Sequence, residues 1–161
     1  MLTARLLSRT FRTVRPTPLA LKCSLQPTLA FRFYSSAGPV TKYTESHEWV
    51  RIEDKVATVG VTDYAQAHLG DVVFVELPEV NAAVTEGSPI AIVESVKAAS
   101  DIYSPVDGTI VAANEELTSS PNLINDNPTD EGWMFKVSFD SADPFKKLMD
   151  AAAYKEFCSK E

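Results

Sequence analysis

A single lysine, Lys97, lies midway between two residues that interrupt regular secondary structure. Pro89 and Pro105 each lie eight residues from it, and a glycine stands just outside each proline. Proline and glycine disfavour strand interiors, so only two short strands fit between them. The spacing therefore predicts a β-hairpin with Lys97 at its tip. A lysine there holds a flexible stem and a nucleophilic amine clear of the core, as a covalently attached cofactor requires.

The expected tip lacks the residues that favour a tight turn. Val96, Ala98 and Ala99 surround Lys97, and Gly, Asn and Asp, which readily take positive φ, are missing from these four positions. The prediction therefore depends on spacing and not on turn propensity. A lysine on a polar hairpin is also a common solubilising surface residue, so the pattern alone leaves modification and simple exposure both open.

The rest of the chain beyond residue 40 alternates mostly with the period of two that β-strands show. Turn residues separate the strands, and one face of the last strand is expected to be buried. The strands are predicted at residues 56–61, 71–77, 90–96, 102–104, 109–113 and 133–139.

Three helical segments are predicted between and after these strands. Each begins with a residue that favours a helix N-terminus, and the first ends at a glycine suited to a left-handed C-terminal position. The segments are a helix capped by Thr62 or Asp63 and ended by Gly70, a turn at 122–125 opened by Ser119 or Ser120, and a C-terminal helix opened by Asp143-Pro144. Together the elements predict a mainly β fold, a small sandwich or flattened barrel with short helices and a C-terminal helix packed across the sheets.

Residues 1–34 have a composition unlike the remainder. They hold six Lys or Arg, contain no Asp or Glu, and are rich in Ser, Thr and Leu. This composition is typical of a mitochondrial transit peptide, and residues 32–35, Arg-Phe-Tyr-Ser, resemble a matrix-protease cleavage site. We expect one domain at 35–161; a basic tail that binds nucleic acid is the alternative for residues 1–34.

Without that segment the chain is strongly acidic. Nine of the 15 Lys and Arg remain against all 22 Asp and Glu, a net charge of −13. Such a charge disfavours nucleic acid and anionic membrane as partners, although solubility explains it equally well. Cys158 is the one cysteine left, which excludes a disulfide within the domain and a cysteine metal site. No stretch reaches the apolar length of a membrane span, so we expect a soluble protein of the mitochondrial matrix.

Four separated stretches carry a resemblance to a known family: residues 46–50 (SHEWV), 60–66 (GVTDYAQ), 69–78 (LGDVVFVELP) and 94–102 (ESVKAASDI). In this order they resemble the H-protein family of the glycine cleavage system, and the likeness extends from about residue 43 to 157. A long ordered set is far more specific than one short motif. The resemblance implies a lipoyl-domain-like fold of two antiparallel sheets with Lys97 at a hairpin tip.

The family further implies a function in carriage and not in catalysis. Lys97 would bear lipoic acid as N6-lipoyllysine. The arm would take the aminomethyl group of glycine from a pyridoxal-phosphate glycine decarboxylase to a tetrahydrofolate-dependent aminomethyltransferase, and electrons to dihydrolipoamide dehydrogenase. Lipoyl-attaching enzymes are the other implied partners. A lipoyl carrier of another complex and a non-catalytic acidic scaffold remain alternatives.

Close relatives in fold fit the sequence less well. Biotin carriers place methionine on both sides of the modified lysine, where Val96 and Ala98 stand here. Lipoyl domains of 2-oxo acid dehydrogenases usually place an acid directly before the lysine, and here that residue is again Val96. The resemblance therefore favours the H-protein family over both.

The family also implies a surface cleft that shelters the loaded arm. Ser46, Glu48, Tyr64 and Asp101 match its lining, and a carboxylate there could pair with the aminomethyl ammonium. Ordinary solvated carboxylates are an equal alternative for Glu48 and Asp101. Glu94 is a candidate for recognition by the lipoyl-attaching enzyme, or a charge that protects a strand edge from aggregation.

An enzymatic site is a weaker interpretation of His47-Glu48. A zinc-binding His-Glu-x-x-His motif needs a second histidine where Arg51 stands, and His68 belongs to another predicted element. We expect His47 to be a structural histidine with its hydrogen bonds satisfied, beside a buried Trp49.

Overall fold

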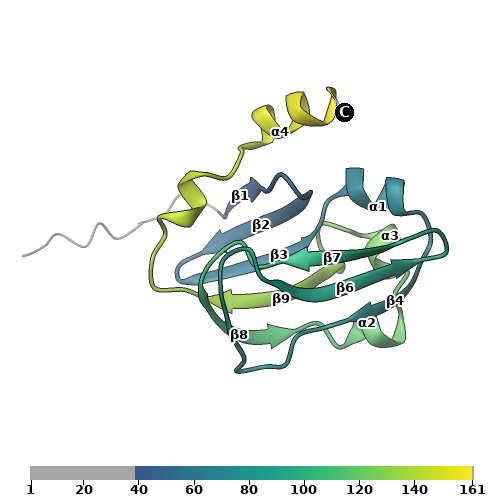
Figure 1. Cartoon of the computed structure of the whole chain (residues 1–161), viewed down its shortest axis with the longest axis horizontal. Helices are drawn as coiled ribbons and strands as arrows, with labels where there is room; N and C mark the ends of the chain where they lie inside the picture. The colour runs from purple at the N-terminus through teal and green to yellow at the C-terminus, as the bar shows by residue number, and fades with distance from the viewer. Residues whose placement is uncertain (1–38, 161) are drawn as a thin grey trace, which may run out of the picture. The chain divides into compact units, whose positions relative to one another are not determined.

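The computed structural model describes residues 39–160, so the predicted transit segment 1–34 lies outside the described part of the chain. Two antiparallel sheets dominate (Figure 1). The larger runs in the order β1-β2-β3-β9-β8-β5 and the smaller in the order β4-β6-β7. The strands are β1 Val40–Tyr43, β2 Glu48–Glu53, β3 Val56–Val61, β4 Val72–Glu76, β5 Ala83–Val84, β6 Pro89–Ser95, β7 Ala99–Tyr103, β8 Gly108–Ala113 and β9 Trp133–Ser138. The predicted mainly β class of two antiparallel sheets is confirmed.

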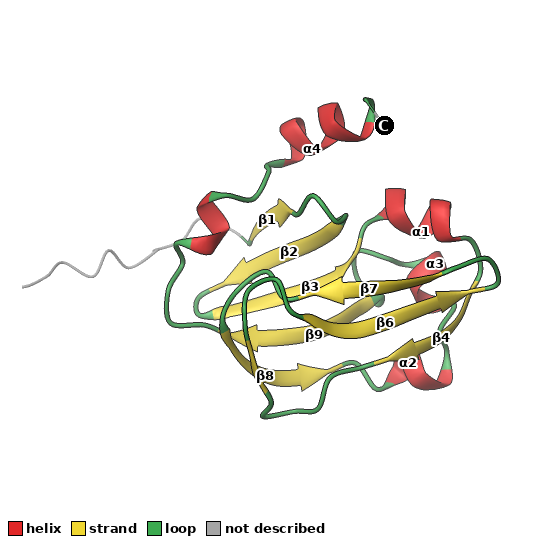
Figure 2. Cartoon of the chain, viewed as in Figure 1, coloured by secondary structure: helices red, strands yellow, loops and turns green. Residues whose placement is uncertain are grey.

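The helices are short and lie outside the sheets (Figure 2). They are α1 Asp63–Leu69, α2 Glu116–Ser119, α3 Leu123–Asp126, the 3₁₀ turn η1 Pro144–Lys146 and α4 Ala151–Cys158. The sequence predictions did not include α2, β1, β2 or β5. Within residues 39–160, no helix has the length and apolar character needed to cross a membrane.

One hydrophobic core joins the two sheets. The larger sheet contributes Val50, Val59 and Phe135, all with no exposed surface, and the smaller contributes Val75 and Val93. Along β6 the buried Ala91 and Val93 alternate with the half-buried Ile90 and Ile92, which is the pattern that predicts half-buried strands. Truncating a fully buried phenylalanine to alanine typically costs about 3–5 kcal/mol. A one-residue slip of a strand would turn these buried side chains toward solvent, so burial of the core fixes the register of the strands.

Strand β9 departs from the predicted single buried face. Met134 and its neighbour Phe135 are both fully buried, so burial does not alternate there, and Trp133 is half-buried with Lys136 over its ring. The pairing with β3 explains this, because Val59 opposes Phe135 while the next residue, Gly60, opposes Trp133. Met134 is the extra residue of a β-bulge, which reverses the alternation at that point.

Helix α1 begins and ends where the sequence predicted. Thr62 is the N-cap and accepts a hydrogen bond from the Ala65 amide at 3.3 Å. Gly70 ends the helix with φ 81°, a conformation that favours glycine. The predicted turn near residue 123 also forms, but neither Ser119 nor Ser120 caps it, since α3 follows Asn122.

The predicted C-terminal helix is confirmed, but the segment from Asp143 onward that was expected to form it is not one continuous helix. It is divided into η1 and α4, because the backbones of Tyr43 and Met149 exchange two hydrogen bonds of 2.9 Å and draw Met149 onto the edge of β1. Asp150 then starts α4 by accepting the Ala153 amide. Ala152 and Ala153 are exposed, and Tyr154 is the buried residue of α4.

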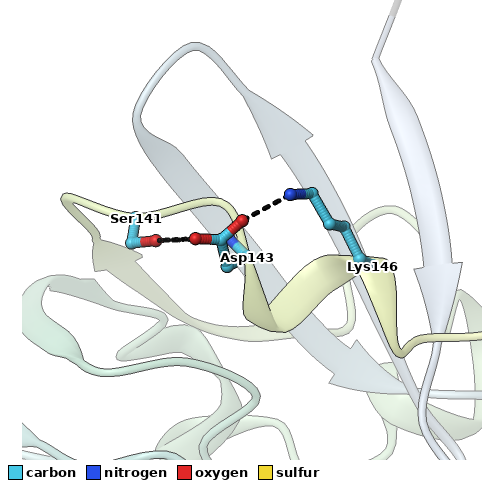
Figure 3. A network of polar contacts seen from close by, with 3 residues as sticks. All are labelled: Ser141, Asp143 and Lys146. Atoms are coloured by element: carbon cyan, nitrogen blue, oxygen red, sulfur yellow. Dashed lines mark hydrogen bonds and ion pairs between the residues drawn. The ribbon is translucent and has the colours of Figure 1, made fainter.

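A local polar network fixes the start of η1 (Figure 3). Asp143 lies between Ser141 and Lys146 and contacts both. The hydrogen bond and positive charge of Lys146 lower the pKa of this carboxyl from its ordinary value. Because the network is exposed, we assign it a local role at the turn.

Candidate functional site

Lys97 lies at the tip of the β6–β7 hairpin, as predicted. Figure 1 shows this hairpin turn at one end of the smaller sheet. The turn closes through the Ser95 amide, which donates to the Ala98 carbonyl at 2.8 Å. The Ser95 hydroxyl also accepts the amides of Lys97 and Ala98 at 3.1 and 3.0 Å and donates to the Ala98 carbonyl. One hydroxyl supplies one donor and two acceptors, so Ser95 is fully used. This serine replaces the positive-φ residue that the sequence lacked, a possibility that serine turn chemistry could have indicated.

The lysine side chain lies over Gly70. A Cβ at that position would lie 2.7 Å from Cε of Lys97 and 3.1 Å from its Nζ. The tip is also tied to the neighbouring segment, since the Val96 amide donates to the Asp71 carbonyl at 3.2 Å. Gly70 therefore ends α1 and leaves room for the lysine stem, and the second role was not predicted.

A surface pocket of about 540 Å³ begins where α1 approaches this stem. Its walls come from α1, from strands β3 and β7 and from the loop before β2. Apolar side chains and a few polar groups share the lining, a mixture typical of binding sites. The lining residues are Ser46, His47, Val61, Tyr64, Ala65, His68, Leu69, Ser100, Asp101 and Ile102.

Three of the four residues predicted to line a cleft meet in this pocket. Ser46 comes from the loop before β2, Tyr64 from α1 and Asp101 from β7, and the carboxylate of Asp101 is exposed. The structure therefore brings together side chains that lie up to 55 residues apart in the sequence.

The fourth, Glu48, lies outside this pocket and borders a neighbouring cavity. It is 1% exposed, so a solvated carboxylate is the wrong description. The Thr44 hydroxyl donates to Oε2 and the Tyr103 amide donates to Oε1 at 3.3 Å. The carboxylate thus joins the start of β2 to the end of β7, and a polar group buried in this way must keep its donors.

Glu94 is exposed on β6 and lies opposite Phe74 of the edge strand β4. Because β6 is the central strand of the smaller sheet, the alternative of a charge on a strand edge is wrong for Glu94. Its role in recognition stays a prediction.

The two histidines contribute more to the pocket than the sequence indicated. Nδ1 of His47 lies 2.9 Å from the Tyr154 hydroxyl, so its bonding is satisfied as expected, but its ring also lines the pocket. His68 packs on Tyr64 at 4.2 Å between ring centroids. Tyr64 and His68 are four residues apart, so their side chains lie on the same face of α1. This spacing could have identified His68 as a pocket residue from the sequence.

Residues 41–161 match the family model described as "Glycine cleavage H-protein". The glycine cleavage system H protein of Thermotoga maritima is 54% identical over 120 residues, which cover 74% of this chain and 97% of that protein. The mitochondrial glycine cleavage system H protein 2 of Arabidopsis thaliana is also 54% identical, covering 74% and 77%.

A solved structure is similar over the same extent. The crystal structure of a glycine cleavage system H protein from Mycobacterium marinum matches with a TM-score of 0.68 and 34% identity, covering 74% of this chain and 97% of that one. Sequence, fold and coverage agree, and the chain belongs to the H-protein family of the glycine cleavage system.

Proposed function

We propose that Lys97 carries a lipoyl group in amide linkage and that the protein is the lipoyl carrier of the glycine cleavage system. The arm takes the aminomethyl group of glycine from the pyridoxal-phosphate decarboxylase to the tetrahydrofolate-dependent aminomethyltransferase, and electrons to dihydrolipoamide dehydrogenase. The observation that carries this proposal is an exposed lysine on a fixed hairpin tip, with its stem on Gly70 beside a pocket.

The residues around Lys97 fit a long covalent group. The serine-braced turn holds the backbone while the side chain stays exposed to an attaching enzyme. Gly70 leaves open the space that a Cβ would fill, directly against the stem. Leu69, the last residue of α1, lines the pocket, so a chain that continues past Gly70 reaches the pocket mouth.

The lipoyl group supplies a disulfide that accepts cargo and electrons in the active sites of partner enzymes. This chain supplies the tether and the shelter. Tethering replaces diffusion between active sites by a high effective concentration.

The pocket lining suits an aminomethyl cargo. Val61, Leu69 and Ile102 offer an apolar wall to the hydrocarbon arm, and they limit access of water. The Asp101 carboxylate offers a charge-assisted hydrogen bond to an ammonium, and the Ser46 hydroxyl offers an acceptor. We assign these residues a binding role and place the bond-making steps in the partner enzymes.

The proposed location is the mitochondrial matrix, with residues 1–34 as the transit peptide. The basic, acid-free composition of that segment supports this. Several relatives bear mitochondrial names, among them the H protein of Pisum sativum, which is 48% identical over 138 residues.

Peptide mass analysis of the protein purified from mitochondria tests the proposal. A lipoyl adduct at Lys97, and at no other lysine, is the expected result. Transfer of label from glycine by the decarboxylase then distinguishes this system from a lipoyl carrier of another complex. An unmodified Lys97, in cells whose other lipoyl proteins are modified, would contradict the carrier role and favour an acidic scaffold.

A matched pair of variants completes the test. Lys97→Arg keeps the charge but cannot accept the acyl group, so glycine oxidation should stop. Lys55→Arg changes an exposed lysine in the turn between β2 and β3, and glycine oxidation should continue. Glycine oxidation by the Lys97→Arg variant would overturn the proposal.

A further inference from the structure

One hydroxyl joins three segments that are distant in the sequence. Tyr154 of α4 is buried, and its Oη lies 2.9 Å from Nδ1 of His47 and 2.8 Å from Oγ1 of Thr62. His47 precedes β2, and Thr62 caps α1. Their backbones also meet, since the Thr62 amide donates to the His47 carbonyl at 3.0 Å. The hydroxyl therefore reinforces the joint between two segments that border the pocket.

The hydrogen bonds have a preferred direction. Thr62 Oγ1 already accepts the Ala65 amide, so its own proton is available to Tyr154 Oη. On this basis we assign the Tyr154 proton to the hydrogen bond with Nδ1 of His47, which places the imidazole proton on Nε2. Burial raises the pKa of the Tyr154 phenol, so the hydroxyl keeps this proton.

The imidazole that Tyr154 holds is part of the pocket wall. The His47 ring lies 4.8 Å from the ring of Tyr64 between centroids, and both line the pocket. The His47 backbone has φ 68°, which is uncommon for histidine and persists only where surrounding contacts hold it. Phe157 of α4 packs on the same imidazole at 5.6 Å.

Helix α4 has its own anchors to the sheet. Tyr154 stacks on Tyr43 of β1 with ring centroids 4.5 Å apart and planes 8° apart. Asp150 caps the helix, and Met149 is bonded to the edge of β1. The helix is thus a fixed support, although none of its described residues lines the pocket.

We propose that Tyr154 is a positioning residue for the arm pocket: its hydroxyl holds the His47 imidazole in the wall that shields the carried aminomethyl group from water. This rests on the proposed function, because the wall matters only if the loaded arm enters the pocket. The C-terminal helix thereby sets the lifetime of the cargo from outside the binding site.

Tyr154→Phe tests the proposal with Tyr43→Phe as its matched control. The first substitution keeps the ring stack and removes the hydroxyl that bonds His47. The second removes a hydroxyl from the other ring of the same stack. Both variants are to be compared at a temperature where circular dichroism shows them fully folded.

The first measurement is ¹⁵N NMR of the His47 imidazole in the unlipoylated protein, which reports the tautomer directly. The wild type and Tyr43→Phe should show one Nε2-protonated form, and Tyr154→Phe a mixture of tautomers. The second is the lifetime of the carrier loaded from glycine by the decarboxylase, followed by release of formaldehyde. Because Tyr154→Phe loses one net hydrogen bond, it should release formaldehyde about five- to tenfold faster than the wild type, and Tyr43→Phe should match the wild type.

The outcomes separate the two proposals. A changed tautomer with an unchanged lifetime, or an unchanged tautomer, would overturn the role of Tyr154 while Lys97 is still lipoylated. Failure of the wild type to accept a lipoyl group would instead overturn the proposed function, and the mass of Lys97 reveals this before any variant is compared.

Discussion

Replacing Gly70 by alanine should have two effects that can be measured separately: a loss of folding stability and a displacement of the Lys97 stem. Gly70 has φ 81°, where an L residue with a side chain is strained by about 1–3 kcal/mol. The new methyl would also stand 2.7 Å from Cε of Lys97. Because a lysine stem is flexible, it moves aside at little cost in stability. We expect unfolding to be easier by about 1–3 kcal/mol, nearly all of it from the backbone.

The control variant is Gly87→Ala. Gly87 has φ 78°, almost the same as Gly70, but a Cβ built on it meets nothing within 4 Å. Urea unfolding should therefore show a similar loss of stability in both variants. The ¹³Cε and ¹Hε shifts of Lys97, measured by NMR in the folded unlipoylated protein, should move in Gly70→Ala and stay unchanged in Gly87→Ala.

The refuting results are equally distinct. Unchanged Lys97 shifts in Gly70→Ala would show that the stem does not rest on Gly70 in solution. A stability loss confined to Gly70→Ala would show that the methyl clash, and not backbone conformation, sets the energy. Either result would refute part of the reasoning.

Three further predictions concern the turn, the phenol and the pocket charge. Ser95→Ala removes the hydroxyl that braces the tip, so urea unfolding should show a loss of about 1–2 kcal/mol and the Lys97 amide should exchange faster with deuterium. The Tyr154 phenol has a raised pKa, so the unfolded chain releases the phenol proton at about pH 10 while the folded protein keeps it. The stability contribution is therefore complete below about pH 10 and falls as pH rises above it, and urea midpoints of Tyr154→Phe should fall less steeply there. Asp101→Asn should shorten the lifetime of the loaded carrier about tenfold by removing a charge-assisted hydrogen bond, whereas the exposed Asp140→Asn should leave it unchanged.

The strands were predictable because their signal is local. Alternation along residues 56–61 and 109–113 reflects burial of every second side chain, and turn residues mark their ends. The bulge at Met134 was not predictable in this way, since it depends on how β9 pairs with β3. Helix division at Met149 depends likewise on a partner more than 100 residues away, Tyr43. Such pairings have no trace in the periodicity of either segment.

The candidate site shows the same difference between local and non-local signals. Lys97 was found from the spacing of prolines around it, because breakers limit strand length locally. The burial of Glu48 was missed, because its donors come from Thr44 on one side and from Tyr103, 55 residues away, on the other. A carboxylate looks solvated until the strand that covers it is known.

Non-local contact also couples the proposed shelter for the arm to residues outside its lining. Tyr154 reaches His47 across 107 residues and Thr62 across 92, and one hydroxyl satisfies both. Removing this buried hydroxyl would leave both of its partners, His47 and Thr62, short of a hydrogen bond, which destabilises the folded protein. The loop before β2 and the cap of α1 are therefore coupled through it. A change in how α4 packs on Tyr43 should then reach the pocket wall, whereas the backbone of the lysine tip is braced locally by Ser95 and the Asp71 carbonyl. Under the proposed function, attachment of the arm depends on the hairpin turn and protection of its cargo on the joint at Tyr154, so substitutions in α4 should alter the second while leaving the first intact.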